Sequence, residues 1–308
     1  MKSRKPNVIV IVPHDTGTSY GCYGNKDVQT PCIDKMAEEG AVFYNNFGTA
    51  PFCSPSRGSI ITGKWPHVNG LMGLTNMGWD LPKENLTDAI LFNKGGYDTI
   101  LCGLQHEMKS SDDLGFETII PTDTTFCADV TPKIVDFIKN RKSNRSFYLR
   151  TGFIEAHRVG KDNLWQPYKD RAPEVDEITV PDFLADTPRA REQHSQFYGS
   201  INAIDEAVGQ ICDALKESGL EDDTLIVYTT DHGIPFPKAK ATLFDNGTNT
   251  VLIMKYPRLI KKNSKYDNLI SNIDLLPTLL DLCGIDIPDD MNGKSFSPLL
   301  KNGDYEEN

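Results

Sequence analysis

The sequence lacks any hydrophobic run long enough to cross a membrane or to form the core of a signal peptide. The longest early apolar run is Val8–Val12, and Pro13 follows it directly. A run of this length is typical of a buried strand. We therefore expect no membrane partner and a cytoplasmic protein, unless a leader was removed from the natural chain.

Paired cysteines are also missing. Seven cysteines are spread widely over 308 residues, and no two of them form a CxxC pair. This spacing argues against a disulfide framework and against a structural zinc site. It favours a reducing compartment.

An excess of positive charge is absent as well. The chain has 32 basic and 43 acidic residues, which gives a net charge of −11. This balance excludes non-specific nucleic-acid binding and attraction to an anionic membrane. A small anionic substrate remains compatible with it, because a local site can be basic within an acidic protein.

Apolar runs alternate with helical patterns along the chain. We expect strands at Asn7–Val12, Ala41–Phe47, Tyr97–Cys102, Ser146–Phe153, Leu225–Thr230 and Val251–Tyr256, and helices at Thr30–Gly40, Ser56–Thr62, Leu86–Lys94, Thr131–Lys139, Gln193–Ser218 and Asp274–Leu282. The alternation predicts an α/β fold with a central mixed, mostly parallel sheet sandwiched by helices. One domain is expected over residues 1–300, with a loop excursion at Arg158–Pro188 and a polar acidic tail at 301–308.

Polar side chains follow four of the predicted strands. They are His14 and Asp15, His106, Glu155 and His157, and Asp231 and His232. One such residue alone is more often a helix cap or a turn residue. Ligands of open parallel sheets bind beyond the carboxyl ends of the strands, so these side chains should converge on a mixed N/O site for a divalent metal. His67 and His194 lack this context and are expected on the surface or in the core.

The sharpest local pattern is Cys53-Ser54-Pro55-Ser56-Arg57, followed by Gly58 and Thr62-Gly63. This segment resembles the C-x-P-S-R signature of the type I sulfatases, which belong to the alkaline phosphatase superfamily. In that family the cysteine is oxidised to formylglycine, whose hydrated aldehyde attacks sulfur and whose remaining hydroxyl then expels sulfate. The resemblance implies that Cys53 is the nucleophile precursor and that a formylglycine-generating or anaerobic maturation enzyme is a partner.

The resemblance extends over nearly the whole chain. It implies a metal site formed by His14, Asp15, Cys53, Asp231 and His232, and a catalytic set formed by Cys53, Arg57, His106, His157 and Lys240. Arg57 would hold the formylglycine, His157 would contact the sulfate or the leaving oxygen, and Lys240 would contact the sulfate. The phrases Ala156-His157-Arg158 and Asp231-x-Gly233-Ile234-Pro235 are most similar to the N-sulfoglucosamine sulfohydrolase branch.

Three features depart from the family pattern. His14 stands where the family has an aspartate, and nitrogen ligands shift the metal preference from the family's calcium toward manganese or zinc. Leu104 stands where the family has a lysine. The sequence stops near Asn308, whereas family members continue, so we expect the C-terminal subdomain to be absent or short.

The sequence thus predicts a hydrolase of sulfate esters or sulfamates that acts on a sulfated saccharide. One alternative is a phosphodiesterase or phosphonate monoester hydrolase of the same superfamily. Another is a catalytically impaired member that binds a sulfated glycan. The oligomeric state stays open.

Overall fold

The computed structural model describes residues 5–159, 165, 168, 170–301, 303, 305 and 307. The strands are β1 Asn7–Ile11, β2 Ala41–Phe43, β3 Asn46–Phe47, β4 Asp98–Gly103, β5 Thr118–Ile120, β6 Phe147–Gly152, β7 Thr224–Thr229, β8 Leu252–Lys255, β9 Ser264–Tyr266 and β10 Ile270–Ser271. The α-helices are α1 Pro31–Glu38, α2 Cys53–Thr62, α3 Pro66–Asn69, α4 Asp88–Lys94, α5 Cys127–Asn140, α6 Pro188–Glu217, α7 Asp245–Thr248, α8 Leu275–Leu282 and α9 Ser297–Leu300.

Eight of these strands form one sheet in the order β5-β4-β6-β1-β7-β8-β2-β9. Within it β8 runs antiparallel to both of its neighbours, and the other pairings are parallel. The expected α/β fold with a mixed, mostly parallel sheet is therefore confirmed. Because the central strands share one direction, their carboxyl ends meet at a single edge of the sheet.

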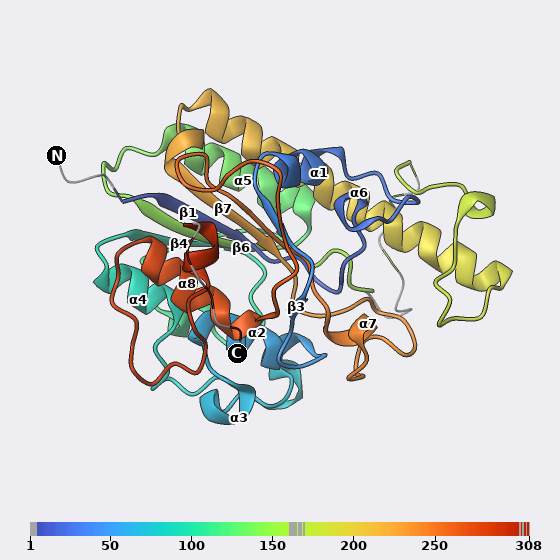
Figure 1. The fold of residues 1–308 in the computed structure, drawn as a ribbon, viewed down its shortest axis with the longest axis horizontal. Coiled ribbons are helices and arrows are strands. Elements are labelled where there is room, and N and C mark those ends of the chain that lie inside the picture. The colour runs from blue at the N-terminus through green and yellow to red at the C-terminus, as the bar shows by residue number, and fades with distance from the viewer. Residues whose placement is uncertain are drawn as a thin grey trace.

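Helices cover both faces of this sheet (Figure 1). Alternate residues of β1 point to opposite faces: Ile9 and Ile11 join a core with residues of α1, α5 and α6, whereas Val8 and Val10 join a second core with α2, α4 and α8. This is the pattern expected of a strand buried on both faces. The two cores hold the central strands rigidly, which fixes the positions of the loops that leave them.

Several predicted elements differ from the structure: the helices expected to begin at Thr131 and Gln193 begin at Cys127 and Pro188. The run 41–47 forms two strands, because the chain leaves the main sheet after β2 and β3 pairs with β10 in a separate two-stranded sheet. The helix expected at Ser56 begins at Cys53, since Pro55 falls in the first turn, where its missing N–H costs no hydrogen bond. Part of the loop predicted at Arg158–Pro188 lies outside the described residues.

Candidate functional site

Six of the seven side chains predicted at the strand ends converge; Glu155 instead lies against α5, where its carboxylate accepts from the backbone N–H of Cys127 at 3.0 Å. His14 and Asp15 follow β1, His106 follows β4, His157 follows β6, and Asp231 and His232 follow β7. The centroid of the His14 ring lies 5.7 Å from that of His106, 4.8 Å from that of His157 and 6.2 Å from that of His232. One edge of the sheet therefore gathers groups that are up to 218 positions apart in the sequence.

Two buried aspartates form the centre of this site. His14 Nδ1 lies 2.8 Å from Asp15 Oδ1 and 3.1 Å from Asp231 Oδ2. His232 Nε2 lies 3.0 Å from Asp15 Oδ1. The backbone of Asp15 has a φ of 60°, in the left-handed region, and its N–H donates to Asp231 Oδ1 at 2.9 Å. Asp tolerates this conformation better than most residues, and such strained positions gather at functional sites.

Cys53 lies in the first turn of α2 and points into the same cluster. Its Sγ is 3.4 Å from His232 Nε2, and the residue is only 2% exposed. Arg57 lies one helical turn later on the same face of α2. Its Nε donates to Asp231 Oδ2 at 3.1 Å, and Nη2 donates to the carbonyl of Pro13 at 2.8 Å. Helix α2 thus inserts both a nucleophile candidate and a cation between the strand ends.

Lys240 and His157 border the aspartates on another side. Lys240 Nζ contacts both carboxylate oxygens of Asp15, at 2.8 and 3.0 Å. His157 Nε2 lies 3.9 Å from Asp15 Oδ2, and its side chain is 34% exposed, in contrast to the fully buried His14 and His232. Among these groups, His157 is therefore well placed to reach a molecule that arrives from solvent.

The electrostatics of the cluster favour charged groups despite burial. Burial disfavours a charged imidazole, but Asp231, Cys53 and Asp15 outweigh it and raise the pKa of His14 to about 9. The pKa of Lys240 is raised to about 12 in the same way, since Asp15 and Cys53 oppose the effect of burial. Protonated imidazoles thus offset the two carboxylates, and the same charge could come from a bound cation.

The surroundings of Cys53 favour its thiolate form. Burial opposes this, but the charge on His14 and hydrogen bonds from His106, His14 and His232 hold the pKa of Cys53 well below its usual range. In contrast, burial lowers the pKa of His157, which favours its neutral form. The site therefore combines an activated position with an uncharged imidazole.

Five residues of the cluster could hold a metal ion. One ligand atom from each of His14, Asp15, Cys53, Asp231 and His232 lies within 4.8 Å of all the others. The Nε2 atom of His14 is buried and has no hydrogen-bond partner among the described residues. An unpartnered nitrogen among two carboxylates, a second imidazole and a sulfur is suited to a divalent cation. The residues present fit the group that the sequence pattern predicted.

Sequence reasoning missed the side chains that support these groups. Ser56 Oγ donates to the carbonyl of Asp231, and Asn272 Nδ2 donates to Ser56 Oγ at 2.8 Å. The carboxylate of Glu107 accepts from the backbone N–H of His106 at 2.8 Å. These residues are distant in sequence from the groups they hold, except for Glu107. Glu107 directly follows His106, and Ser56 lies within the segment 53–57 that carries the family resemblance, so both had a signal in the sequence, whereas Asn272 had none.

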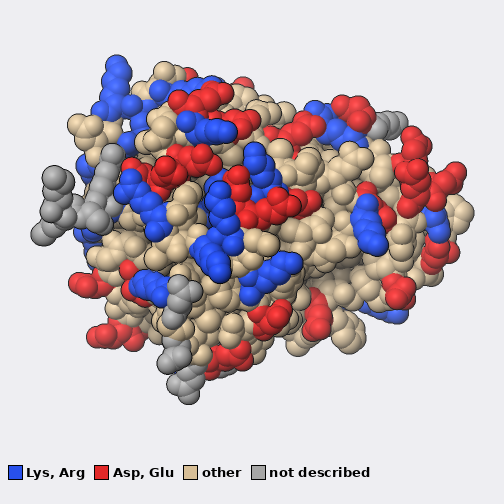
Figure 2. Space-filling model, turned by 45° about the horizontal axis from the view of Figure 1, so that its top comes forward, with Lys and Arg blue, Asp and Glu red and all other residues tan. Residues whose placement is uncertain are grey.

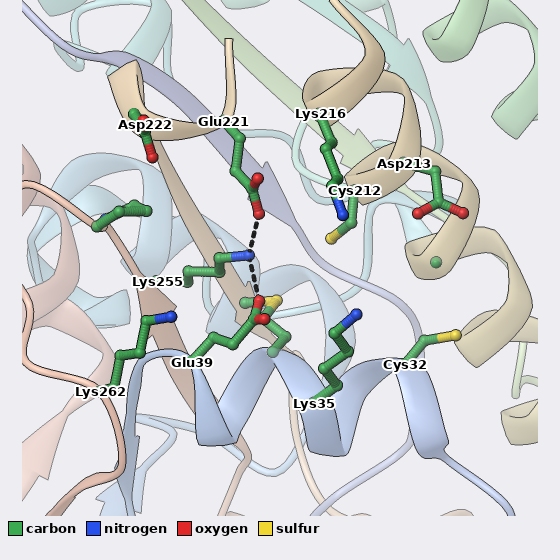
Figure 3. A pocket seen from close by; sticks show the side chains of 13 residues that line it. Cys32, Lys35, Glu39, Cys212, Asp213, Lys216, Glu221, Asp222, Lys255 and Lys262 are labelled. Atoms are coloured by element: carbon green, nitrogen blue, oxygen red, sulfur yellow. Dashed lines mark hydrogen bonds and ion pairs between the residues drawn. The ribbon is translucent and has the colours of Figure 1, made fainter. Parts of the chain in front are cut away.

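A second charged pocket, of about 250 Å³, lies at the opposite edge of the sheet (Figure 3). Lys255 Nζ lies 2.6 Å from Glu39 and 2.7 Å from Glu221, so the buried ammonium is fully paired. Lys35 and Lys262 also lower the pKa of Glu39, after the larger effect of its hydrogen bond with Lys255. The charges in this pocket compensate one another. On the face drawn in Figure 2, acidic and basic side chains are interspersed in the same manner.

Comparison with known proteins gives a consistent result. A sequence model of the sulfatase family matches residues 6–285. Human N-sulphoglucosamine sulphohydrolase is 27% identical over 97% of this chain, and an ulvan-active sulfatase from Formosa agariphila is 29% identical over 99% of it. The chain spans 67% and 60% of the length of these two relatives.

A solved structure shares the fold. The phosphonate monoester hydrolase of Agrobacterium radiobacter has a TM-score of 0.82 to this chain, and the match covers 98% of this chain and 78% of that one. The two sequences are 19% identical, so the likeness shows the fold alone. None of the helices in the described residues is long and apolar enough to span a membrane.

Proposed function

The chain belongs to the sulfatase family, and from this premise we propose that it hydrolyses sulfate esters or sulfamates on a sulfated saccharide. One observation carries the proposal: Cys53 and Arg57 lie on one face of α2, inside a buried cluster that contains a five-residue candidate metal site. The expectation that a maturation enzyme converts Cys53 to formylglycine belongs to this proposal. In the structure, Sγ marks the position that the hydroxyls of the hydrated aldehyde would occupy.

The first step forms a bond between a formylglycine hydroxyl and sulfur and breaks the bond from sulfur to the leaving oxygen or nitrogen. His106 contacts the Cys53 position and is placed to take the proton of the attacking hydroxyl. His157 faces solvent, where the leaving saccharide remains. Because burial lowers its pKa, its protonated form is a stronger acid and would give its proton to the leaving atom. The second hydroxyl then loses its proton to water, and the bond from the same carbon to the sulfate oxygen breaks. Sulfate leaves, and the aldehyde that forms is hydrated again by water.

The remaining residues stabilise negative charge. Lys240 and Arg57 place two cations beside the aspartates that border the reacting sulfate. His14, Asp15, Asp231 and His232, with the residue at position 53, would hold a divalent cation, calcium by family and manganese or zinc by their nitrogen ligands. Such a cation, when bound, would polarise a sulfate oxygen and lower the pKa of the attacking hydroxyl.

Two observations favour a second candidate function, the hydrolysis of phosphodiesters or phosphonate monoesters. Imidazoles supply two of the five candidate metal ligands, and the fold is shared with a phosphonate monoester hydrolase. Both reactions transfer an oxyanionic group to the same nucleophile and would use the same residues. The two functions differ in which oxyanion the site accepts.

The decisive experiment produces the protein with and without a formylglycine-generating enzyme and examines the peptide that contains Cys53 by mass spectrometry. Converted, metal-loaded protein is then assayed for release of sulfate from sulfated saccharides and of phosphorus-containing products from diesters and phosphonates. We expect a peptide mass lowered by replacement of the thiol with an aldehyde, and sulfate release. Converted protein that releases neither product would contradict both hydrolase functions and favour a glycan-binding role.

A further inference from the structure

We propose that Arg158 recognises a second anionic group on the substrate, a carboxylate or an additional sulfate on the saccharide whose sulfate is cleaved. The inference rests on the proposed sulfatase function and adds a specificity-determining residue and a narrower substrate class. Its basis is a guanidinium that is fixed beside the site and has no anionic partner in the part of the chain that the structure describes.

Two aromatic rings fix the position of Arg158. Its guanidinium carbon lies 4.1 Å from the centroid of the Trp165 ring and 6.0 Å from that of Phe236. Both rings are buried, and they stack on each other with centroids 5.4 Å apart. A guanidinium over aromatic faces keeps its charge and gains a defined plane. Arg158 is therefore more ordered than an arginine that extends freely into solvent.

These rings belong to the segments that carry the catalytic candidates. Trp165 Nε1 donates at 3.0 Å to the carbonyl of the residue just before His157. Phe236 lies in the loop that runs from the metal-ligand candidates after β7 to Lys240. Arg158 thus lies between the segment that presents His157 and the loop that presents Lys240. This position is beside the ion-pair network and outside it.

Arg158 has no ion pair among the described residues, and its Nε atom is buried without a hydrogen-bond partner. The charged residue that affects it is another cation, since Arg189 adds to burial in lowering the pKa of Arg158. The buried arginines Arg57 and Arg150 each contact a carboxylate instead. A guanidinium can offer paired N–H donors to a carboxylate or a sulfate. Neither terminal nitrogen of Arg158 has a hydrogen bond to a residue that the structure describes, so both can do so.

This arrangement selects among saccharides. The chain carries a net charge of −11, so it repels a multiply charged glycan overall. A fixed cation beside the site attracts an anionic saccharide locally, and it stabilises the orientation in which a second anionic group contacts Arg158. His157 faces the leaving part of the substrate, and the next residue in the chain reaches a neighbouring substituent. The favoured substrate is therefore a saccharide with a second oxyanion close to the cleaved sulfate.

The experiment compares wild-type protein with Arg158→Met and Arg158→Lys, all converted and metal-loaded. The substrates are three disaccharides of equal size: one with a single sulfate, one that adds a carboxylate, and one that adds a second sulfate. We expect wild type to prefer at least one of the two doubly charged substrates, and Arg158→Met to reduce that preference about tenfold, mainly through KM. Arg158→Lys should retain part of the preference. The doubly charged disaccharide that wild type prefers shows whether Arg158 binds a carboxylate or a second sulfate.

Arg189→Met is the matched control, because Arg189 is a nearby cation that already pairs with Glu192. It should leave the preference unchanged. An equal loss on all three substrates in Arg158→Met, or an unchanged preference, would overturn the inference. If wild type turns over none of the substrates, the proposed function fails and the inference is tested by calorimetric binding of the same disaccharides. Binding of the doubly charged sugars that does not depend on Arg158 would then refute it.

Discussion

The two edges of the central sheet each carry an ionic cluster, and the clusters differ in whether their buried polar atoms have partners. At the amino edge, Lys255 is held between Glu39 and Glu221, and each charge has a partner. At the carboxyl edge, His14 keeps a buried Nε2 without a partner beside Asp231 and Cys53. A pocket lined by charged residues is therefore weak support for function by itself. Unsatisfied buried atoms at converging strand ends are stronger support.

Removing the nucleophile candidate should have the largest effect. We expect Cys53→Ala to lower kcat for sulfate release by about 10⁴-fold or more, because the residue at position 53 supplies the nucleophile in the proposed mechanism. Cys212→Ala, in the amino-edge pocket, is the matched control and should retain near wild-type activity. Sulfate release by purified, metal-loaded proteins checks this prediction, and comparable activity in both variants would remove Cys53 from the mechanism.

Neutralising one aspartate at the carboxyl edge should have the second-largest effect. Asp231→Asn leaves the buried Arg57 without its carboxylate partner, which costs about 3–5 kcal/mol, and it removes a metal ligand candidate. We expect thermal unfolding of wild type to shift upward with added divalent metal, and that shift to vanish in Asp231→Asn. Glu221→Gln at the amino edge should keep the full shift. Equal metal content in both variants, measured by mass spectrometry, would contradict the metal site.

The histidine that faces solvent should give an effect that depends on the substrate. His157→Ala is expected to reduce the rate about 10²-fold on saccharide sulfates, whose leaving alcohols need a proton. Aryl sulfates have better leaving groups and should lose less. His67→Ala serves as the control, because His67 is exposed on α3 and takes no part in the cluster. A loss that is the same for both substrate types would assign His157 to binding instead.

The amino-edge cluster should affect only stability, and by the smallest amount. The hydrogen bond from Lys255 lowers the pKa of Glu39, so its contribution is present above the unfolded value of about 4.3 and is lost as the pH falls through the lower folded value. Glu39→Gln should therefore cost under about 1 kcal/mol at pH 7 and almost nothing at pH 3. Urea unfolding at both pH values tests this. A loss of sulfatase activity would contradict it.

Much of the site could be predicted from sequence because its groups follow continuous buried strands. The runs before His14 and Asp231 are apolar on both faces, which identified them as central strands and placed the next polar residues at one edge. The order of the strands in the sheet could not be obtained in this way. It depends on packing between elements that a single sequence does not reveal.

The parts that sequence did not predict depend on contacts between distant segments. Strand β3 has two residues and pairs with β10, so no periodicity could separate it from β2. The contact between Lys240 and Asp15 joins positions 225 residues apart, and the support of Asp231 by Ser56 and Asn272 joins three elements. The stacking of Arg158 depends likewise on the position of Phe236.

The burial of α2 has a consequence for the order of events during synthesis. All ten residues of this helix are buried, and Cys53 lies in its first turn. An enzyme that oxidises the Cys53 side chain cannot reach it in the folded protein without unfolding α2. On the proposal that Cys53 is converted, conversion would therefore take place on the emerging or unfolded chain, and a molecule that folds first would keep the thiol form. The ratio of active to inactive protein in a cell would then depend on the rate of modification relative to the rate of folding.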